Sequence, residues 1–111
     1  MEVIWLTEAR EQMRAVYAYG KAVFGRKVAM EFRAEIYQQA KLLADFPYLG
    51  PIETCVSDLP LSYRSLVVHR HYKLIYRIDE ARQTVYISAL WDTRRNPAQL
   101  GEDLPCHEGM K

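Results

Sequence analysis

The stretch that decides the fold is YRSLVVHRHYKLIYRIDEARQTVYISALWDTRRNP, which runs from Tyr63 to Pro97 and predicts three consecutive β-strands. Its middle part alternates strictly between two faces of an extended chain. One face carries apolar and aromatic residues: Tyr72, Leu74, Tyr76 and Ile78. A period of two indicates a strand with one buried face. We therefore expect the opposite face to stay open and to present Lys73 and Arg77.

The last predicted strand shows the same alternation. Its odd-numbered residues are apolar: Val85, Ile87, Ala89 and Trp91. We expect all of them on one buried face, because an antiparallel meander commonly packs one face and leaves the other to solvent. The strand ends in Arg94 and Arg95, and adjacent residues of an extended chain point in different directions.

The register of the first hairpin decides where Arg64 points. A four-residue loop, 68–71, pairs Leu66 with Lys73 and places Arg64 on the face of Lys73. A three-residue loop, 69–71, places Arg64 on the opposite face, because a slip of one residue reverses every side chain.

The first half of the chain predicts one strand and two helices. Residues 2–6 are largely apolar and indicate a short strand. Apolar residues at spacings of three and four then predict a helix that ends at Phe24-Gly25 and a second from near Arg26 to the Phe46-Pro47 break. A connection this short makes the helices antiparallel neighbours. The predicted class is α+β, in the order β-α-α-β-β-β, with a helical hairpin on one face of a mainly antiparallel twisted sheet.

Composition limits the class of protein. The chain has 111 residues, half of them hydrophobic, which is enough for one domain with a modest core. No apolar run approaches the roughly 20 residues of a membrane helix, and we expect no signal peptide. The two cysteines have no metal-ligand spacing and are expected to be reduced thiols in the cytoplasm. The net charge of +1 means that any nucleic-acid contact has to come from a local patch.

Several segments, in their order, resemble a known family. They are the apolar first strand leading into TEAREQM, the FPYLGP turn after the second helix, YRSLVVHRHYKLIYRI, and YISALWDTRRNP. Together they resemble the RelE/ParE family of toxins from type II toxin–antitoxin systems, of the plasmid-stabilisation type. The resemblance covers residues 2–97 and implies a toxin domain over 1–97. Residues 98–111 are expected to form a C-terminal tail that docks through Leu100 and Leu104.

The resemblance implies a growth-inhibiting toxin that a cognate antitoxin neutralises in a heteromeric complex. A ParE-like member would bind DNA gyrase. The alternative is a RelE-like, ribosome-dependent mRNA endonuclease that needs no metal or other cofactor, and a second alternative is a degenerate member that only binds its antitoxin. A grooved helical hairpin and an open sheet face suit helix-in-groove or strand-addition recognition of the antitoxin. We expect residues such as Tyr17, Phe24 or Tyr37 to supply the apolar part of the groove.

Four cations are the candidate catalytic residues that the resemblance implies: Arg64, Lys73, Arg94 and Arg95. Lys73 stands where RelE-like nucleases carry a catalytic Arg, Arg64 matches a basic position of the preceding strand, and the pair follows the last strand. The resemblance favours the register that puts Arg64 beside Lys73. A fixed cation stabilises charge that develops on a phosphate in the transition state. The plainer interpretation is a solvated strand cation for Lys73 and an ion pair with a helix carboxylate for Arg64. For the arginine pair it is binding to acidic groups of the antitoxin or to Asp92.

An acid–base pair for nuclease chemistry is not evident. His69 and His71 flank Arg70 in the hairpin and suit proton transfer near neutral pH, but residues in an exposed loop are the simpler interpretation. Nuclease members carry an aromatic residue or His near the C-terminus, whereas residues 97–111 hold no aromatic residue and His107 is the candidate there. This departure favours a toxin that acts by binding.

Overall fold

The computed structural model describes residues 1–54, 61–96 and 99–100 of the chain. Two helices and four strands make up the fold: β1 (Glu2–Trp5), α1 (Thr7–Phe24), α2 (Arg26–Asp45), β2 (Arg64–His69), β3 (Tyr72–Asp79) and β4 (Thr84–Asp92). The predicted β-α-α-β-β-β order and the α+β class are confirmed. Pro97, Leu104, His107 and the two cysteines, Cys55 and Cys106, lie outside the described part.

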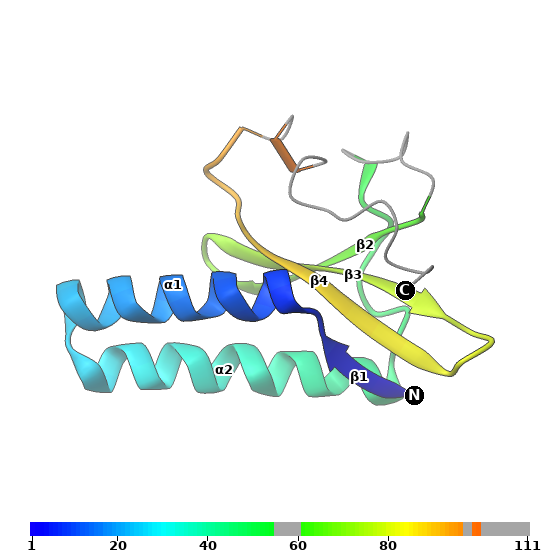
Figure 1. The fold of residues 1–111 in the computed structure, drawn as a ribbon, viewed down its shortest axis with the longest axis horizontal. Helices are drawn as coiled ribbons and strands as arrows, with labels where there is room; N and C mark the ends of the chain where they lie inside the picture. The colour runs from blue at the N-terminus through cyan, green and yellow to red at the C-terminus, as the bar shows by residue number, and fades with distance from the viewer. Residues whose placement is uncertain (55–60, 97–98, 101–111) are drawn as a thin grey trace.

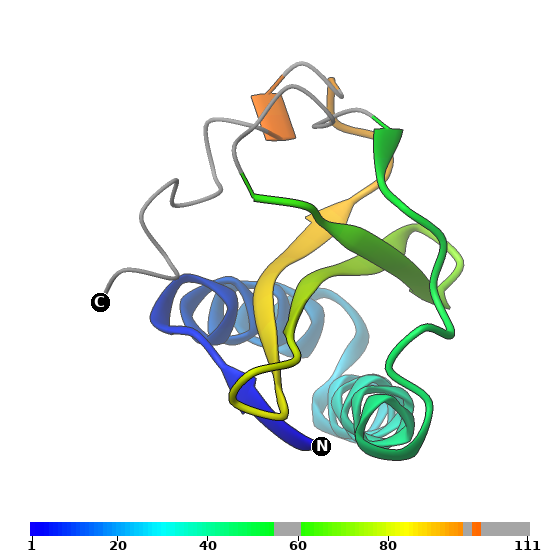
Figure 2. The same cartoon turned by 90° about the vertical axis from the view of Figure 1, so that its right-hand side faces the viewer.

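The strands form one mixed sheet in the order β1-β4-β3-β2. β1 runs parallel to β4, while β3 is antiparallel to both β4 and β2. The two helices lie side by side under one face of this sheet, as Figures 1 and 2 show from two directions. Neither is long and apolar enough to cross a membrane, and this finding applies to the described residues.

One glycine joins the two helices. α1 ends at Phe24 and α2 begins at Arg26, so Gly25 alone makes the turn. Its φ of 91° and ψ of 163° lie in a region that is essentially reserved for glycine. Its N–H donates to the Lys21 carbonyl, and its own carbonyl accepts from the Ala29 N–H. The chain therefore reverses within one residue, and the joined end of the hairpin projects beyond the strands (Figure 1).

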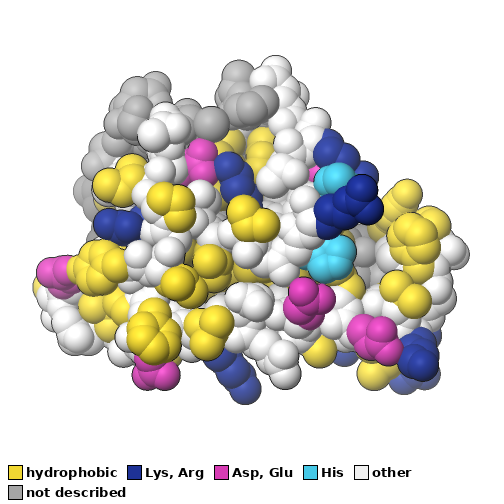
Figure 3. Space-filling view, turned by 180° about the vertical axis from the view of Figure 1, so that it is seen from behind, with side chains coloured by type: hydrophobic (Ala, Val, Ile, Leu, Met, Phe, Trp, Pro, Cys, Tyr) yellow, Lys and Arg dark blue, Asp and Glu magenta, His cyan; other side chains and the backbone are white. Residues whose placement is uncertain are grey.

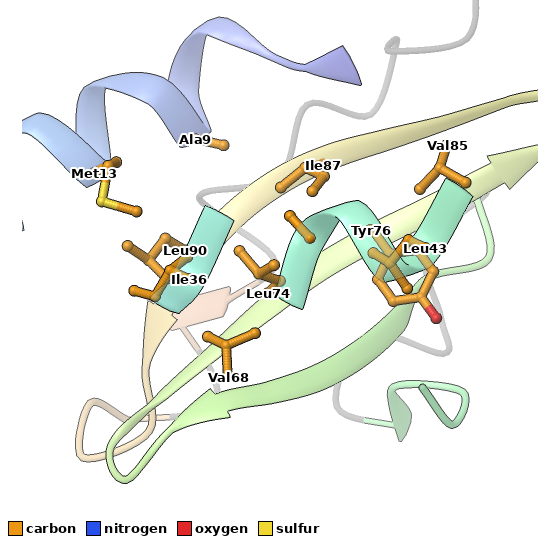
Figure 4. Packing of buried hydrophobic residues seen from close by; sticks show 11 residues of the cluster. Ala9, Met13, Ile36, Leu43, Val68, Leu74, Tyr76, Val85, Ile87 and Leu90 are labelled. Atoms are coloured by element: carbon orange, nitrogen blue, oxygen red, sulfur yellow. The ribbon is translucent and has the colours of Figure 1, made fainter. Parts of the chain in front are cut away.

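The main core fills the space between the helical hairpin and the sheet. Figure 4 shows side chains of both helices and three strands pointing toward one another. The buried members are Ala9, Met13, Ile36, Ala40, Leu43, Val68, Leu74, Tyr76, Val85, Ile87 and Leu90. The predicted apolar stripes of α1, α2 and β3 meet in this core.

A β-bulge in β4 corrects the predicted orientation of that strand. Ile75 pairs with Ala89 but Tyr76 pairs with Ile87, so Ser88 is the extra residue. An extra residue shifts the alternation by one position. Val85, Ile87 and Leu90 consequently belong to the main core, whereas Ala89 and Trp91 belong to a second apolar cluster. The prediction of one apolar face along β4 was wrong, because the bulge reverses the face to which the odd-numbered side chains after it point.

The second cluster covers part of the sheet face that we expected to be open. Its buried members are Tyr63, Ile75, Ala89, Trp91 and Leu100, with Leu61 packed against them. The predicted docking of Leu100 is thus confirmed. Arg77, also expected to be solvated on this face, is 7% exposed and stacks on the Tyr86 ring at 4.5 Å.

Candidate functional site

Two segments that carry basic residues meet at one end of the sheet. The β2–β3 turn and the end of β4 are neighbours, because Tyr72 pairs with Asp92 and the Thr93 N–H donates to the His71 carbonyl over 2.7 Å. We call the five side chains they carry the basic rim: His69, Arg70, His71, Arg94 and Arg95. Histidine and basic side chains are seen together at this end in Figure 3. His71 is half-buried, and the other four are exposed.

Arg94 holds Asp92 in a two-pronged ion pair. Its Nε and Nη2 donate to the two carboxylate oxygens of Asp92 at 2.9 and 2.8 Å, and its backbone N–H donates to Oδ1. These hydrogen bonds hold the pKa of Asp92 below its usual range and raise that of Arg94. Side-chain exposures are 60% for Arg94 and 24% for Asp92. The Arg94 side chain also hydrogen-bonds Tyr72, and its other guanidinium N–H groups lie at the exposed surface.

An aromatic group supports the rim from the helix side. The Phe32 ring of α2 meets the His69 and Tyr72 rings edge-on, at centroid distances of 4.8 and 5.4 Å. Burial, and then the nearby Asp92 charge, raise the pKa of the Tyr72 hydroxyl. Tyr72 therefore stays protonated near neutral pH. Its place at the helix-side edge makes it a packing residue that orients the turn.

Arg95 points to the other side of the sheet. Its guanidinium lies 4.3 Å from the centroid of the Trp91 ring, and Trp91 pairs with Lys73 across the strands. Arg94 meanwhile turns toward Asp92. The expected divergence of the two adjacent arginines is confirmed, and the cause is the strand alternation that places Asp92 and Trp91 on opposite faces.

Lys73 is held by a carboxylate that the sequence analysis missed. Its Nζ lies 2.7 Å from Oε2 of Glu53, and the two side chains are 18% and 6% exposed. Glu53 precedes β2 in the segment that follows α2, where no periodic pattern marks it. Its backbone N–H donates to the Tyr63 carbonyl, which anchors it beside the second cluster. The charge of Lys73 is therefore matched within the protein.

Arg64 lies on the opposite face from Lys73. In the observed register Arg64 pairs with Tyr76 and Val67 pairs with Lys73. The favoured register was therefore wrong. Leu66 faces Leu74, as the three-residue loop requires, and a bulge at Val68 then brings His69 opposite Tyr72. Paired residues share a face, so Arg64 and Lys73 do not act on one phosphate from one side.

The environment of Arg64 explains its position. Its Nη1 donates to the Gly50 carbonyl over 2.8 Å, and its guanidinium lies 5.0 Å from the centroid of the Tyr48 ring. A shallow hollow of about 210 Å³ lies here, lined by Tyr48, Ser62, Arg64, Ile78 and Glu80. Arg64 thus fixes the segment after α2 rather than joining the basic rim.

That segment is bound tightly to the sheet. The Tyr76 hydroxyl accepts a hydrogen bond from the Gly50 N–H and donates one to the Pro47 carbonyl, at 2.9 and 2.8 Å. Gly50 passes so close to β2 that a Cβ there would lie 2.1 Å from the Ser65 carbonyl oxygen. Only glycine fits this approach without movement of the backbone.

The described residues contain no group of three or more His, Cys, Asp or Glu side chains arranged to hold a metal ion. His69 packs against Phe32, and His71 contributes its carbonyl to the turn. Across the described ranges, the candidate cations therefore divide among three settings: Lys73 with Glu53, Arg64 with the segment after α2, and the arginine pair at the rim.

Large apolar side chains are exposed at the joined end of the helical hairpin. Tyr19, Val23, Phe24 and Val28 are 50–65% exposed. Of the residues expected to form an apolar surface, Phe24 is 65% and Tyr37 is 38% exposed, while Tyr17 is half-buried beneath the Arg33 guanidinium. A second exposed apolar group lies at the end of α2 and in the segment after it: Leu42, Phe46, Tyr48, Leu49 and Ile52. Hydrophobic patches are visible at both ends of the face in Figure 3.

Comparisons with known proteins agree with this architecture. A family model described as the ParE toxin of type II toxin-antitoxin system, parDE, matches residues 3–97. A solved structure titled "Chromosomal ParDE TA system from P. aeruginosa" is similar, with a TM-score of 0.69 and 20% sequence identity; the match covers 83% of this chain and 95% of that one. At this identity the structural likeness bears on the fold. No curated protein matches the chain.

Proposed function

Since the chain belongs to the ParE toxin family of type II toxin–antitoxin systems, we propose that it inhibits growth by binding DNA gyrase in the cytoplasm and that a cognate antitoxin neutralises it. The toxin class follows from the family. The target is inferred from the ParE-like precedent and from the arrangement of the cations.

The separation of Lys73 from Arg64 is the observation that favours gyrase binding over mRNA cleavage. A ribonuclease of the RelE type would need several cations around one phosphate, together with groups that move protons. Here Lys73 bonds Glu53 at 2.7 Å, and Arg64 lies on the other face and bonds Gly50. Neither cation is placed to share a phosphate with the other. A toxin that acts by binding needs a complementary surface instead, and the exposed patches provide one.

The target is tested by inducing the chain without its antitoxin. We expect growth arrest with DNA-damage signalling, and purified toxin should trap gyrase on cleaved DNA or inhibit its supercoiling. Primer extension on cellular mRNA should show no new cleavage sites. Arrest with mRNA cleavage at ribosomes would favour the nuclease instead, and an absence of arrest would indicate a member that only binds its antitoxin.

The joined end of the helical hairpin supports the antitoxin proposal. Val23 and Phe24 at the end of α1, and Val28 at the start of α2, expose 50–65% of their surface. An amphipathic antitoxin helix would cover such a surface with its own apolar face, as in helix-in-groove recognition. Covering these side chains removes apolar area from water, which is the main driving force of association.

Two matched valine variants test this interface with the cognate antitoxin. Val23→Ser at the hairpin should weaken the complex by roughly 1–2 kcal/mol, the order expected for one buried aliphatic side chain. Val67→Ser is the control, because Val67 is 68% exposed on β2, away from the hairpin. Isothermal titration calorimetry measures both. Equal losses, or no loss at Val23, would contradict the proposed interface.

A further inference from the structure

We propose that the basic rim is a binding site for the phosphate backbone of duplex DNA. It is formed where the β2–β3 turn meets the end of β4. This inference goes beyond the proposed function, because a direct DNA contact requires neither gyrase nor the antitoxin. A negative result in the gyrase assay would not contradict DNA binding by the rim. A negative result in the DNA-binding assay would not contradict gyrase binding by another surface.

Positive charge is concentrated at the rim. The whole chain carries a net charge of +1. The rim, however, carries the three guanidinium groups of Arg70, Arg94 and Arg95, of which Arg94 pairs with Asp92. Figure 3 also shows an acidic side chain beside a histidine at this end. Two histidines, His69 and His71, lie in the same turn. Clustered guanidinium groups are the usual means of binding phosphate.

The rim is held in place by contacts on several sides. The two segments of the rim are tied by the Thr93–His71 hydrogen bond and the Tyr72–Asp92 strand pair. Phe32 packs under the turn, and Trp91 lies under the Arg95 guanidinium. The cations are therefore held on a fixed frame, which lowers the entropy lost when they meet a regular array of phosphates.

The aromatic residues near the rim favour duplex over single-stranded nucleic acid. Proteins that bind single strands stack exposed aromatic rings on the bases. At this rim Trp91 is buried, and Phe32 and Tyr72 are half-buried in packing. These three rings therefore support the frame of the rim rather than present a surface for stacking on bases. Contacts to phosphates alone give binding that is independent of sequence.

Asp92 provides a sharp test because it offsets part of this charge. It occupies two N–H groups of Arg94 and opposes the phosphates directly. Replacing it by Asn keeps a carbonyl oxygen for the Arg94 backbone N–H and removes the negative charge. Asp92→Asn should therefore bind DNA several-fold more tightly than the parent chain, an effect that a purely structural role of Asp92 would not produce.

Fluorescence anisotropy with a labelled mixed-sequence duplex measures the contact, using the full chain over a series of KCl concentrations. Affinity should fall with salt, with a slope of log K against log[salt] of roughly −2 to −3 for two or three phosphates. Arg70→Gln and Arg95→Gln should each weaken binding several-fold and reduce the slope by about 1.

Arg82→Gln is the matched control. Arg82 is 61% exposed and pairs with Asp79, much as Arg94 is 60% exposed and pairs with Asp92, but it lies at the β3–β4 turn. It should bind DNA like the parent chain. Three results would overturn the proposal: no binding by the parent chain, the same loss in Arg82→Gln as in the rim variants, or tighter binding of single-stranded RNA or DNA of equal length. Circular dichroism establishes that each variant is folded.

Discussion

At the scale of single residues, Tyr76 connects the main core to the segment that follows α2. Its ring is fully buried in the core, and its hydroxyl bridges Gly50 and Pro47. The strand pattern predicted the burial of the ring, whereas the partners of the hydroxyl depend on a segment without any periodic signal. Buried hydroxyls with two partners are costly to remove, because the partners then lose their bonds.

Tyr76→Phe should lower the free energy of unfolding by about 1–3 kcal/mol, since the Gly50 N–H and the Pro47 carbonyl would each lose a partner. Urea denaturation measures the change. Tyr48→Phe is the control, because Tyr48 is 52% exposed and should change stability by less than about 0.5 kcal/mol. Equal effects in the two variants would show that the Tyr76 hydroxyl contributes nothing specific.

Asp92 should contribute to stability in a pH-dependent manner. The hydrogen bonds from Arg94 lower its pKa in the folded state below the ordinary value of 3.8. The contribution is therefore complete above that ordinary value and is lost as the pH falls through the lower folded-state pKa. Asp92→Asn should make stability fall less steeply with acid below about pH 4, as thermal melts at a series of pH values would show. If the loss of stability at acidic pH were the same in Asp92→Asn and in the parent chain, this role would be contradicted.

At the scale of secondary-structure elements, the turn between the helices and the bulge in β4 determine the geometry. The glycine stop at Phe24-Gly25 and the break at Phe46-Pro47 were correctly predicted, because caps and breakers act locally. The bulge at Ser88 was not predicted. The bulge depends on which residues of β3 and β4 pair with each other, and no residue type in β4 predicts it. Its effect is to move Trp91 to the second cluster, beneath Arg95.

Two glycine variants should separate backbone strain from packing in the hairpin. Gly25→Ala should cost about 1–3 kcal/mol, because its φ of 91° suits glycine while no atom lies within 4 Å of an added Cβ. Gly20→Ala, inside α1, would place its Cβ 3.8 Å from Ala29, an ordinary contact, and should stabilise by up to about 1 kcal/mol. Urea denaturation compares them. Effects of the same sign would refute the strain argument at Gly25.

At the scale of the whole molecule, the sheet is covered on both faces. The helical hairpin covers one face. The second cluster covers part of the other with residues from β3 and β4 and from the chain before β2 and after β4. The basic rim lies at one end of this sheet, where the β2–β3 turn meets the end of β4. Exposed apolar side chains remain on the hairpin and after α2, so a free toxin presents surfaces that a partner would cover.

Leu100 should be needed for the second cluster. It is fully buried there although it lies beyond the expected end of the toxin domain at residue 97. Leu100→Ala should destabilise the protein by about 2–5 kcal/mol through loss of buried contacts and the cavity left behind. Leu49→Ala, at a position 49% exposed, is the control and should cost much less. Chemical denaturation followed by tryptophan fluorescence measures both, and equal costs would place Leu100 outside the core.

The sequence alone determined the order and type of the elements, the helical hairpin and the family. These depend on local periodicity, on caps and breakers, and on the order of short motifs. The tertiary structure alone decided that Arg64 and Lys73 lie on opposite faces, that Glu53 neutralises Lys73, and that Ala89 and Trp91 leave the main core. Each of these depends on strand register or on contacts between distant segments. A shift of one residue in the strand pairing moves every side chain to the opposite face of the sheet, and the local sequence pattern does not predict such a shift.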